Sequence, residues 1–188
     1  MHSKLIRLLL CPYFVVICTA IANPNITQTW IPQAGTSHAT VVEKDGHRAV
    51  KFNCNFSDTS IPRAVWDTIV KIDMTECRGI RFQLKCENLT PISSFNIYFH
   101  SGEGWYSAEF DVNSSDWHEI KIDKAETNIE GKPAGWRDID RIRICAWRGE
   151  DKNTAFFVSD MQLLPADTGI YIVRNESAMF SSPAELPT

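Results

Sequence analysis

Residues 94–112 read SFNIYFHSGEGWYSAEFDV, in which apolar and polar side chains alternate on both sides of a glycine-rich centre. Alternation with a period of two is typical of strands that bury one face, because successive side chains point to opposite sides. Gly102 and Gly104 separate the two alternating runs, and such a centre predicts a tight hairpin. The stretch therefore predicts two antiparallel strands that share a buried side.

The same alternation recurs through the middle of the chain between clusters of Gly, Pro, Asn, Asp and Ser, without helical periodicity of useful length. Seven or more short strands favour an all-β protein, a sandwich of two antiparallel sheets. We expect segment 123–139 to be a long loop with at most one helical turn, because it contains Gly131, Pro133 and Gly135. The predicted strands cover residues 49–56, 79–86, 94–100, 105–112, 118–122, 141–147 and 155–163.

The amino-terminal segment has the pattern of a signal peptide. Lys4 and Arg7 precede an apolar run at residues 8–21, and Ala20 and Ala22 supply the small residues that signal peptidase requires. A membrane anchor is the weaker alternative, because the run has about 14 residues and a spanning helix needs about 20. We therefore expect a secreted, periplasmic or cell-surface protein with no membrane span after cleavage. The predicted organisation is a signal peptide at 1–22, a β-sandwich domain at 23–165 and a flexible tail or linker at 166–188.

The balance of charge argues against one class of partner. The formal net charge is −4, and it becomes −6 when Lys4 and Arg7 leave with the signal peptide. The sequence has no cluster of Lys and Arg that would match a phosphate backbone. Nucleic acid is therefore not an expected partner.

Four cysteines lie outside the predicted signal peptide: Cys54, Cys77, Cys86 and Cys145. Cys77 and Cys86 lie at opposite ends of one predicted strand, roughly 30 Å apart, so they cannot pair with each other. We expect at most one disulfide. Cys54 and Cys86 are the least disfavoured pair, because both take the inward phase of their strands, and buried free thiols are the alternative.

In each predicted strand the apolar side chains point into the core, so the side chains that alternate with them point outward. The outward residues combine aromatic rings with guanidinium, amide and carboxylate groups. Such a surface suits a sugar, whose C–H patches stack on aromatic rings while its hydroxyls bond to planar polar groups. The candidate ligand-binding residues are Trp105, Tyr98, His100, Glu109, Arg143 and Trp147, and the outward phase also includes Arg81, Gln83 and Lys85.

Two plainer interpretations remain open. Most sandwiches carry mixed polar residues at exposed strand positions, and the outward residues could lie on two different sheets.

For a structural calcium ion we would test Glu43, Asp45 and Asp160, since hard cations take carboxylate oxygens. Solvated or capping roles for these three acids are the alternative, because no calcium-loop spacing accompanies them. No cofactor is otherwise predicted.

Catalytic motifs are absent from the sequence. It contains no His-Glu-x-x-His, no Gly-x-Ser-x-Gly and no phosphate-binding glycine loop. Glu103 and Glu109 could be nominated as a glycosidase pair, but any acidic protein offers such pairs. We therefore do not predict an enzyme, and a small hydrolase is the weakest hypothesis.

Several segments resemble carbohydrate-binding modules with the galactose-binding-domain-like jelly roll. WD at 66–67, IDMT at 72–75 and RGIRF at 78–82 resemble the opening strands of these modules. WHEIKI at 117–122 resembles a later strand, and IDRIRI at 139–144 with FFVSDMQL at 156–163 resembles the closing pair. The resemblance implies a jelly-roll β-sandwich of the kind that precedes catalytic regions in secreted bacterial polysaccharide-degrading proteins.

The implied function is a non-catalytic module that binds a polysaccharide or glycan and assists a catalytic partner domain. The alternative is a structural or protein-interaction sandwich without a sugar ligand. Five Asn-x-Ser/Thr triplets would be glycosylated in a eukaryotic secretory pathway, whereas the bacterial resemblance favours chance occurrence. These triplets begin at Asn25, Asn55, Asn88, Asn113 and Asn175.

Overall fold

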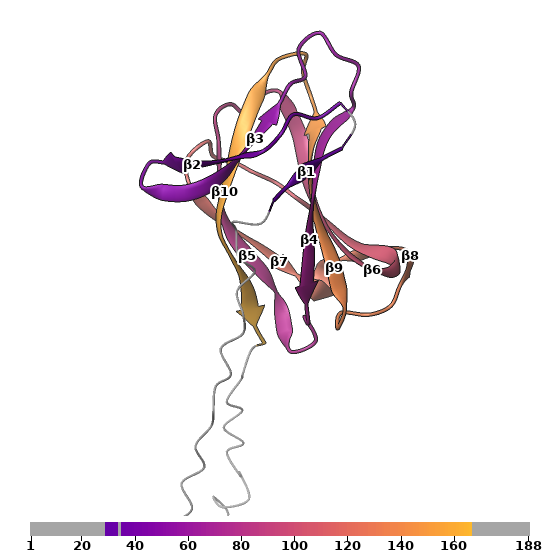
Figure 1. The fold of residues 1–188 in the computed structure, drawn as a ribbon. Coiled ribbons are helices and arrows are strands. Elements are labelled where there is room, and N and C mark those ends of the chain that lie inside the picture. Colours follow the sequence, from indigo (N-terminus) through magenta and orange to yellow (C-terminus); the bar gives the residue numbers. More distant parts are fainter. Residues whose placement is uncertain (1–28, 34, 167–188) are drawn as a thin grey trace, which may run out of the picture.

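The computed structural model describes residues 29–33 and 35–166, which form a β-sandwich of two antiparallel sheets packed face to face (Figure 1). Within these residues the only helical element is the short 3-10 turn η1 (Lys124–Glu126), and no helix is long and apolar enough to cross a membrane. The all-β jelly-roll prediction is confirmed. The predicted signal peptide and residues 167–188 of the predicted tail lie outside the described residues.

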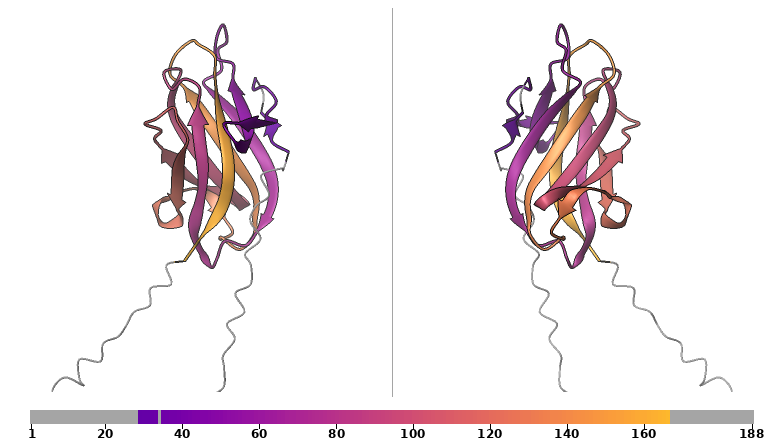
Figure 2. Two further views of the ribbon diagram at one scale, coloured as in Figure 1. Left: turned by 90° about the vertical axis from the view of Figure 1, so that its left-hand side faces the viewer. Right: turned by 90° about the vertical axis from the view of Figure 1, so that its right-hand side faces the viewer.

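Each sheet contains five labelled strands. The first sheet has the order β1-β4-β9-β6-β8, and the second has the order β2-β3-β10-β5-β7. The right view of Figure 2 faces the first sheet, and the left view faces the second. The first sheet comprises β1 (Ile31–Pro32), β4 (Arg63–Ile72), β9 (Ile139–Arg148), β6 (Ile92–Phe110) and β8 (Asn128–Pro133). The second comprises β2 (Thr40–Lys44), β3 (His47–Cys54), β10 (Thr154–Pro165), β5 (Cys77–Cys86) and β7 (His118–Asp123).

Element β6 holds both arms of the predicted hairpin. The rings of Phe95 and Phe110 stack with centroids 5.6 Å apart, although a straight strand would separate them by about 50 Å. The chain reverses at Gly102, which has a positive φ of 60°. The first arm then pairs with β9 and the second arm with β8, so the hairpin prediction is confirmed.

Alternation in the sequence did not predict four strands, β1, β2, β4 and β8, although the family resemblance indicated an opening strand at residues 66–67 within β4. In β4 five consecutive residues, 64–68, are buried, so the strand has no alternation to detect. β8 also lacks alternation, because its residues are almost all exposed and it pairs with β6 through the backbone. The expectation of a long loop over 123–139 was therefore wrong where β8 lies, whereas the single helical turn that it allowed is present as η1.

The core lies between the two sheets and is rich in aromatic rings. Phe52 and Phe156 stack at 4.8 Å, and Trp66 packs edge-on against Phe52 at 5.0 Å. The predicted inward phase is confirmed, because every one of its apolar residues in four strands is buried. These residues are Ile80, Phe82, Leu84, Phe95, Ile97, Phe99, Tyr106, Ala108, Phe110, Ile142, Ile144 and Ala146.

The four described cysteines are free and buried. Cys54 on β3 and Cys86 on β5 cannot pair, because β10 runs between their strands. Two strand spacings amount to about 10 Å, whereas the Cα atoms of a disulfide lie within about 7 Å. The favoured pair was therefore wrong and the free-thiol alternative holds. Burial raises the pKa of all four thiols and keeps them protonated at neutral pH.

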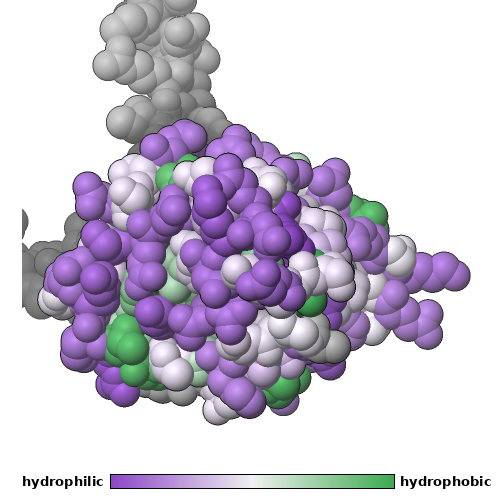
Figure 3. Space-filling model, turned by 90° about the horizontal axis from the view of Figure 1, so that it is seen from above, coloured by the Kyte–Doolittle hydropathy of each residue, from purple (hydrophilic) through white to green (hydrophobic). Residues whose placement is uncertain are grey.

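Loops at 55–62, 87–91, 111–117 and 149–153 gather at the end of the sandwich that is uppermost in Figure 1. Seen from above, this end is mostly hydrophilic (Figure 3). Three of the glycosylation triplets, at Asn55, Asn88 and Asn113, place exposed asparagines on these loops. Asn25 and Asn175 lie outside the described residues, and glycosylation stays a prediction.

Candidate functional site

The outer face of the first sheet gathers all six predicted ligand-binding residues. Strand register places Tyr98 beside Arg143, and Trp147 lies beside Arg63 of β4. Trp105 and Glu109 point outward from the second arm of β6, because the two residues that alternate with them, at 106 and 108, are buried. His100 completes the set, next to Arg141. The other outward residues, Arg81, Gln83 and Lys85, lie on the second sheet.

Trp105 is a partly exposed platform with a packed underside. Its ring rests on a small buried cluster of Val65, Tyr98 and Cys145. Tyr98 meets the ring edge-on at 6.1 Å, and His100 meets it edge-on at 4.6 Å. These contacts hold the indole in place before any ligand arrives, which lowers the entropy cost of stacking a ligand on it.

An ion pair with a buried carboxylate and a partly exposed guanidinium lies beside the platform. Arg143 donates from Nε to Oδ1 of Asp67 at 2.7 Å and from Nη2 to Oδ2 at 2.9 Å. The same guanidinium lies 4.5 Å from the centroid of the Trp105 ring. Asp67 also accepts from Nε2 of Gln33 at 3.2 Å, and Nη1 of Arg141 lies 3.7 Å from it. The hydrogen bonds to Asp67 raise the pKa of Arg143, so this cation is fixed in position.

The upper part of the outer face carries the second predicted tryptophan. Trp147 donates from Nε1 to Oδ1 of Asn96 at 2.6 Å, which fixes the orientation of the indole. The guanidinium of Arg63 lies 4.8 Å from the centroid of the Trp147 ring. On the sheet Tyr98 lies between the two tryptophans. Burial raises the pKa of its hydroxyl, so the group remains a neutral donor.

His100 has an acidic partner at the lower part of the face. Its Nδ1 lies 2.6 Å from Oδ1 of Asp140, which orients the ring toward Trp105. Glu130 of β8 lies opposite Trp105 in the register, and Glu109 is exposed on β6. The β6–β8 side of the face is therefore acidic, while the β4–β9 side carries guanidinium groups.

A hollow of about 300 Å³ opens on the β4–β9 side of the face. Two guanidinium side chains line it, together with one amide and three apolar side chains. Its lining residues are Gln33, Ile61, Pro62, Arg63, Val65 and Arg143.

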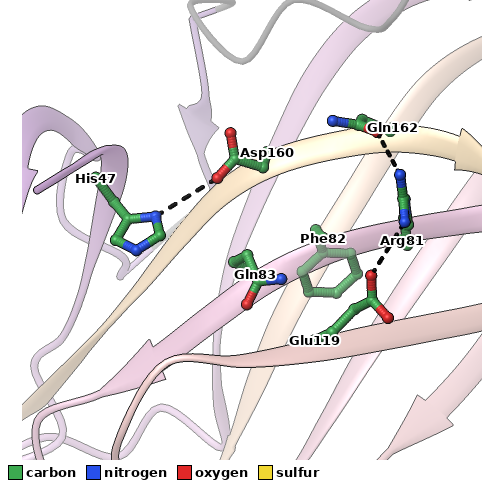
Figure 4. Close-up of a pocket in the computed structure, with 7 residues that line it drawn as sticks. All are labelled: His47, Arg81, Phe82, Gln83, Glu119, Asp160 and Gln162. Carbon is green, nitrogen blue, oxygen red and sulfur yellow. Dashed lines mark hydrogen bonds and ion pairs between the residues drawn. The ribbon is translucent and has the colours of Figure 1, made fainter.

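A second hollow, of about 280 Å³, lies on the outer surface of the second sheet (Figure 4). Arg81 bridges Oε1 of Gln162 at 3.0 Å and Oε1 of Glu119 at 3.4 Å. Nδ1 of His47 lies 3.5 Å from Oδ2 of Asp160 across the hollow. No exposed aromatic platform is among its lining residues, so it is the weaker candidate for sugar stacking.

The three acids proposed for calcium do not converge. Asp45 pairs with Lys85 at 3.2 Å, and Asp160 faces His47. Glu43 lies on β2 opposite Arg48. In the described part of the chain no group of three or more His, Cys, Asp or Glu side chains is placed to hold a metal ion. Calcium binding stays an untested prediction that these contacts do not favour.

The sequence analysis missed Asp67, Arg63 and Gln33, which complete the outer face of the first sheet. Asp67 and Arg63 lie on β4, the strand with no detectable alternation, and Gln33 follows the two-residue strand β1. The pairing of Asp67 with Arg143 joins residues 76 positions apart, so no local signal could have revealed it.

No family model matches this sequence, and no curated protein matches it either. Solved structures do match in fold. The family 11 carbohydrate-binding module from Clostridium thermocellum, solved with a β-1,3-1,4-mixed-linked tetrasaccharide, has a TM-score of 0.55 and 14% identity, covering 73% of this chain and 88% of that chain.

Two further structures give the same result. The family 11 module of the cellulosomal cellulase Lic26A-Cel5E of Clostridium thermocellum has a TM-score of 0.54 and 16% identity, covering 78% of this chain and 94% of that chain. A non-crystalline-cellulose-specific module of family 28 has a TM-score of 0.51 and 15% identity, covering 73% and 89%. The chain therefore has the β-sandwich fold of carbohydrate-binding modules.

Proposed function

We propose that this protein is a secreted, non-catalytic carbohydrate-binding module whose ligand lies on the outer face of the first sheet. The observation that carries the proposal is the Trp105 platform, held by a buried cluster beneath it and by the Arg143–Asp67 pair beside it. A pyranose ring stacks on such an indole through its C–H face. Neighbouring guanidinium, amide and carboxylate groups then bond to its hydroxyls.

Export from the cell and a catalytic partner domain are part of the same proposal. The signal-peptide pattern at residues 1–22 supports export. One structural neighbour is a module of a cellulosomal cellulase, which supports a role beside a glycan-degrading catalytic domain. In that role the module would hold the partner domain near a polysaccharide, raising its effective concentration at the substrate.

One observation favours a protein-interaction role for the same face. Ile69 is 56% exposed on the outward side of β4, next to Arg141. An exposed apolar side chain on this face also suits a contact with a neighbouring protein domain. This alternative predicts that the outer face binds a protein and no sugar.

Titration calorimetry with a panel of oligosaccharides tests the proposal. The panel should contain neutral β-glucans and acidic glycans, and each positive ligand should be repeated with Trp105→Ala. Binding that is lost in this variant is the expected result. A panel without any binding, or binding that Trp105→Ala leaves unchanged, would exclude the proposed face. Release of reducing sugar from any polysaccharide would contradict the non-catalytic role.

A further inference from the structure

We propose that the glycan is anionic, and that its carboxylate or sulfate group occupies the hollow between Arg63 and Arg143. This inference rests on the proposed function and names the class of ligand for the same face. It is carried by the donors that line the hollow, by the burial of Asp67, the carboxylate that pairs with Arg143, and by the separation of charge across the face.

Hydrogen-bond donors predominate among the polar side chains that line the hollow, and the other three lining side chains are apolar. A guanidinium has five donor hydrogens and no acceptor, and two of the described lining side chains, Arg63 and Arg143, carry one. Gln33 donates one of its two Nε2 hydrogens to Asp67, which leaves the second hydrogen as a donor and Oε1 as the one side-chain acceptor among the lining residues. Neutral sugar hydroxyls both donate and accept, whereas a carboxylate or sulfate only accepts. The lining therefore matches an anion better than a neutral sugar.

The negative charge of Asp67 does not cancel this site. The Asp67 side chain is 4% exposed, whereas the Arg143 and Arg141 side chains are 21% and 38% exposed. The carboxylate thus lies beneath the guanidinium groups, and the cations meet the solvent. Asp67 is one negative charge for two nearby cations, so an unneutralised positive charge remains on this side of the face.

Arg63 adds a second unneutralised charge at the mouth of the hollow. No carboxylate among the described residues forms an ion pair with it. The guanidinium lies 4.8 Å from the centroid of the Trp147 ring and also hydrogen-bonds the Tyr98 side chain. These contacts order the side chain, and a guanidinium has five donor hydrogens, so others remain for a ligand. The planar fork of an ordered guanidinium is the group that binds a carboxylate or sulfate in a bidentate manner.

Acidic residues elsewhere on the face restrict where an anionic group of the ligand can bind. Glu109 and Glu130 lie on the β6–β8 side, away from the hollow, and the formal net charge of the chain is −4. A polyanion would be repelled from most of this surface and attracted only to the β4–β9 side. Binding should therefore be selective for a correctly placed anionic group and should weaken as ionic strength rises.

The experiment compares one sugar with and without its charge. Calorimetry on the full chain would use trigalacturonate, its methyl ester, a sulfated galactan oligosaccharide and cellotetraose. We expect trigalacturonate or the sulfated oligosaccharide to bind at least about tenfold more tightly than the two neutral ligands, as charge-assisted bonds would give. The carboxylate and sulfate arms of the panel identify which anion is preferred.

Variants of Arg63 test whether its guanidinium binds the anionic group of the ligand. Arg63→Gln should remove the preference for the anionic ligand, and Arg63→Lys should retain part of it because it keeps the charge without the planar fork. Arg81→Gln, on the second sheet, is the matched control and should change nothing. Thermal melting of each variant checks the fold.

The outcomes separate this inference from the proposed function. If cellotetraose or the methyl ester binds at least as tightly as the acidic ligand, or if Arg63→Gln keeps the preference, the anionic inference fails while a Trp105-dependent sugar site stands. If no ligand of the panel binds, both proposals fail.

Discussion

Arg143 and Asp67 form a two-point ion pair that joins adjacent strands, and the same guanidinium lies against the ring of Trp105. The pair therefore connects β4, β9 and the second arm of β6 in one polar contact on the outer face of the first sheet. Its carboxylate is nearly inaccessible to solvent. Stability and the position of the aromatic platform consequently depend on the same pair of residues.

Removing the charge of Asp67 should destabilise the protein. Asp67→Asn leaves the partly exposed Arg143 guanidinium without its counter-ion, and we expect a loss of about 2 kcal/mol in free energy of unfolding, the range for charged hydrogen bonds. Urea denaturation measures this change. Asp111→Asn, at an exposed loop position, is the matched control and should stay within about 0.5 kcal/mol of the parent. A double variant Asp67→Asn with Arg143→Gln should recover part of the loss, and an equal or greater loss would contradict the pairing argument.

Trp105→Ala should weaken glycan binding by about 1–3 kcal/mol, the range for loss of an aromatic stacking platform. It should also lower the melting temperature modestly, because the indole covers the Val65, Tyr98 and Cys145 cluster. Trp117→Ala is the comparison variant, since Trp117 packs on His47 at the second sheet. Affinity that falls equally in both variants would mean that the effect is general and not due to the platform.

Gly104→Ala should detach the hairpin from β8. A Cβ atom at this position would lie 2.6 Å from the backbone carbonyl oxygen of Glu130, which cannot move without breaking the strand pairing. We expect a loss of more than about 2 kcal/mol in stability, together with weaker binding, because Trp105 is the next residue. At Gly46 an added Cβ meets nothing within 4 Å, so Gly46→Ala should cost only the positive-φ strain of about 1 kcal/mol. Similar losses in both variants would refute the close-packing argument.

Alkaline pH should destabilise the fold through Cys145. Burial raises the pKa of this thiol from 9.0 to about 12. The folded protein thus holds the proton more tightly than the unfolded chain, so the stabilisation is complete below pH 9 and decreases as the pH rises toward about 12. By pH 10 this thiol should account for a loss of about 1 kcal/mol. Urea denaturation at pH 8 and pH 10 should give a smaller decrease for Cys145→Ala than for the parent, and an identical decrease would contradict the assignment.

Alternation in the sequence predicted the strands whose two sides differ in environment. The arms around Gly102 and the strands β5 and β9 have mostly one side in the core and the other outside, so their apolar phase was visible. β10 was predicted as well, although residues 154–159 are buried on both sides. β4 is buried on both sides over residues 64–68, and β8 is exposed along its length. Neither produces a period of two, and both were missed for that reason.

The sequence by itself determined the side of the sheet on which Trp105, Tyr98 and Arg143 project, because side-chain direction depends only on position along a strand. It also determined the reversal at Gly102, since a local turn needs only local chemistry. Tertiary structure alone decided that β4 joins β9 in one sheet while β10 separates Cys54 from Cys86. Strand order is set by contacts between residues far apart in the chain. The Asp67–Arg143 pair and the donor-lined hollow beside it therefore exist only in the folded protein.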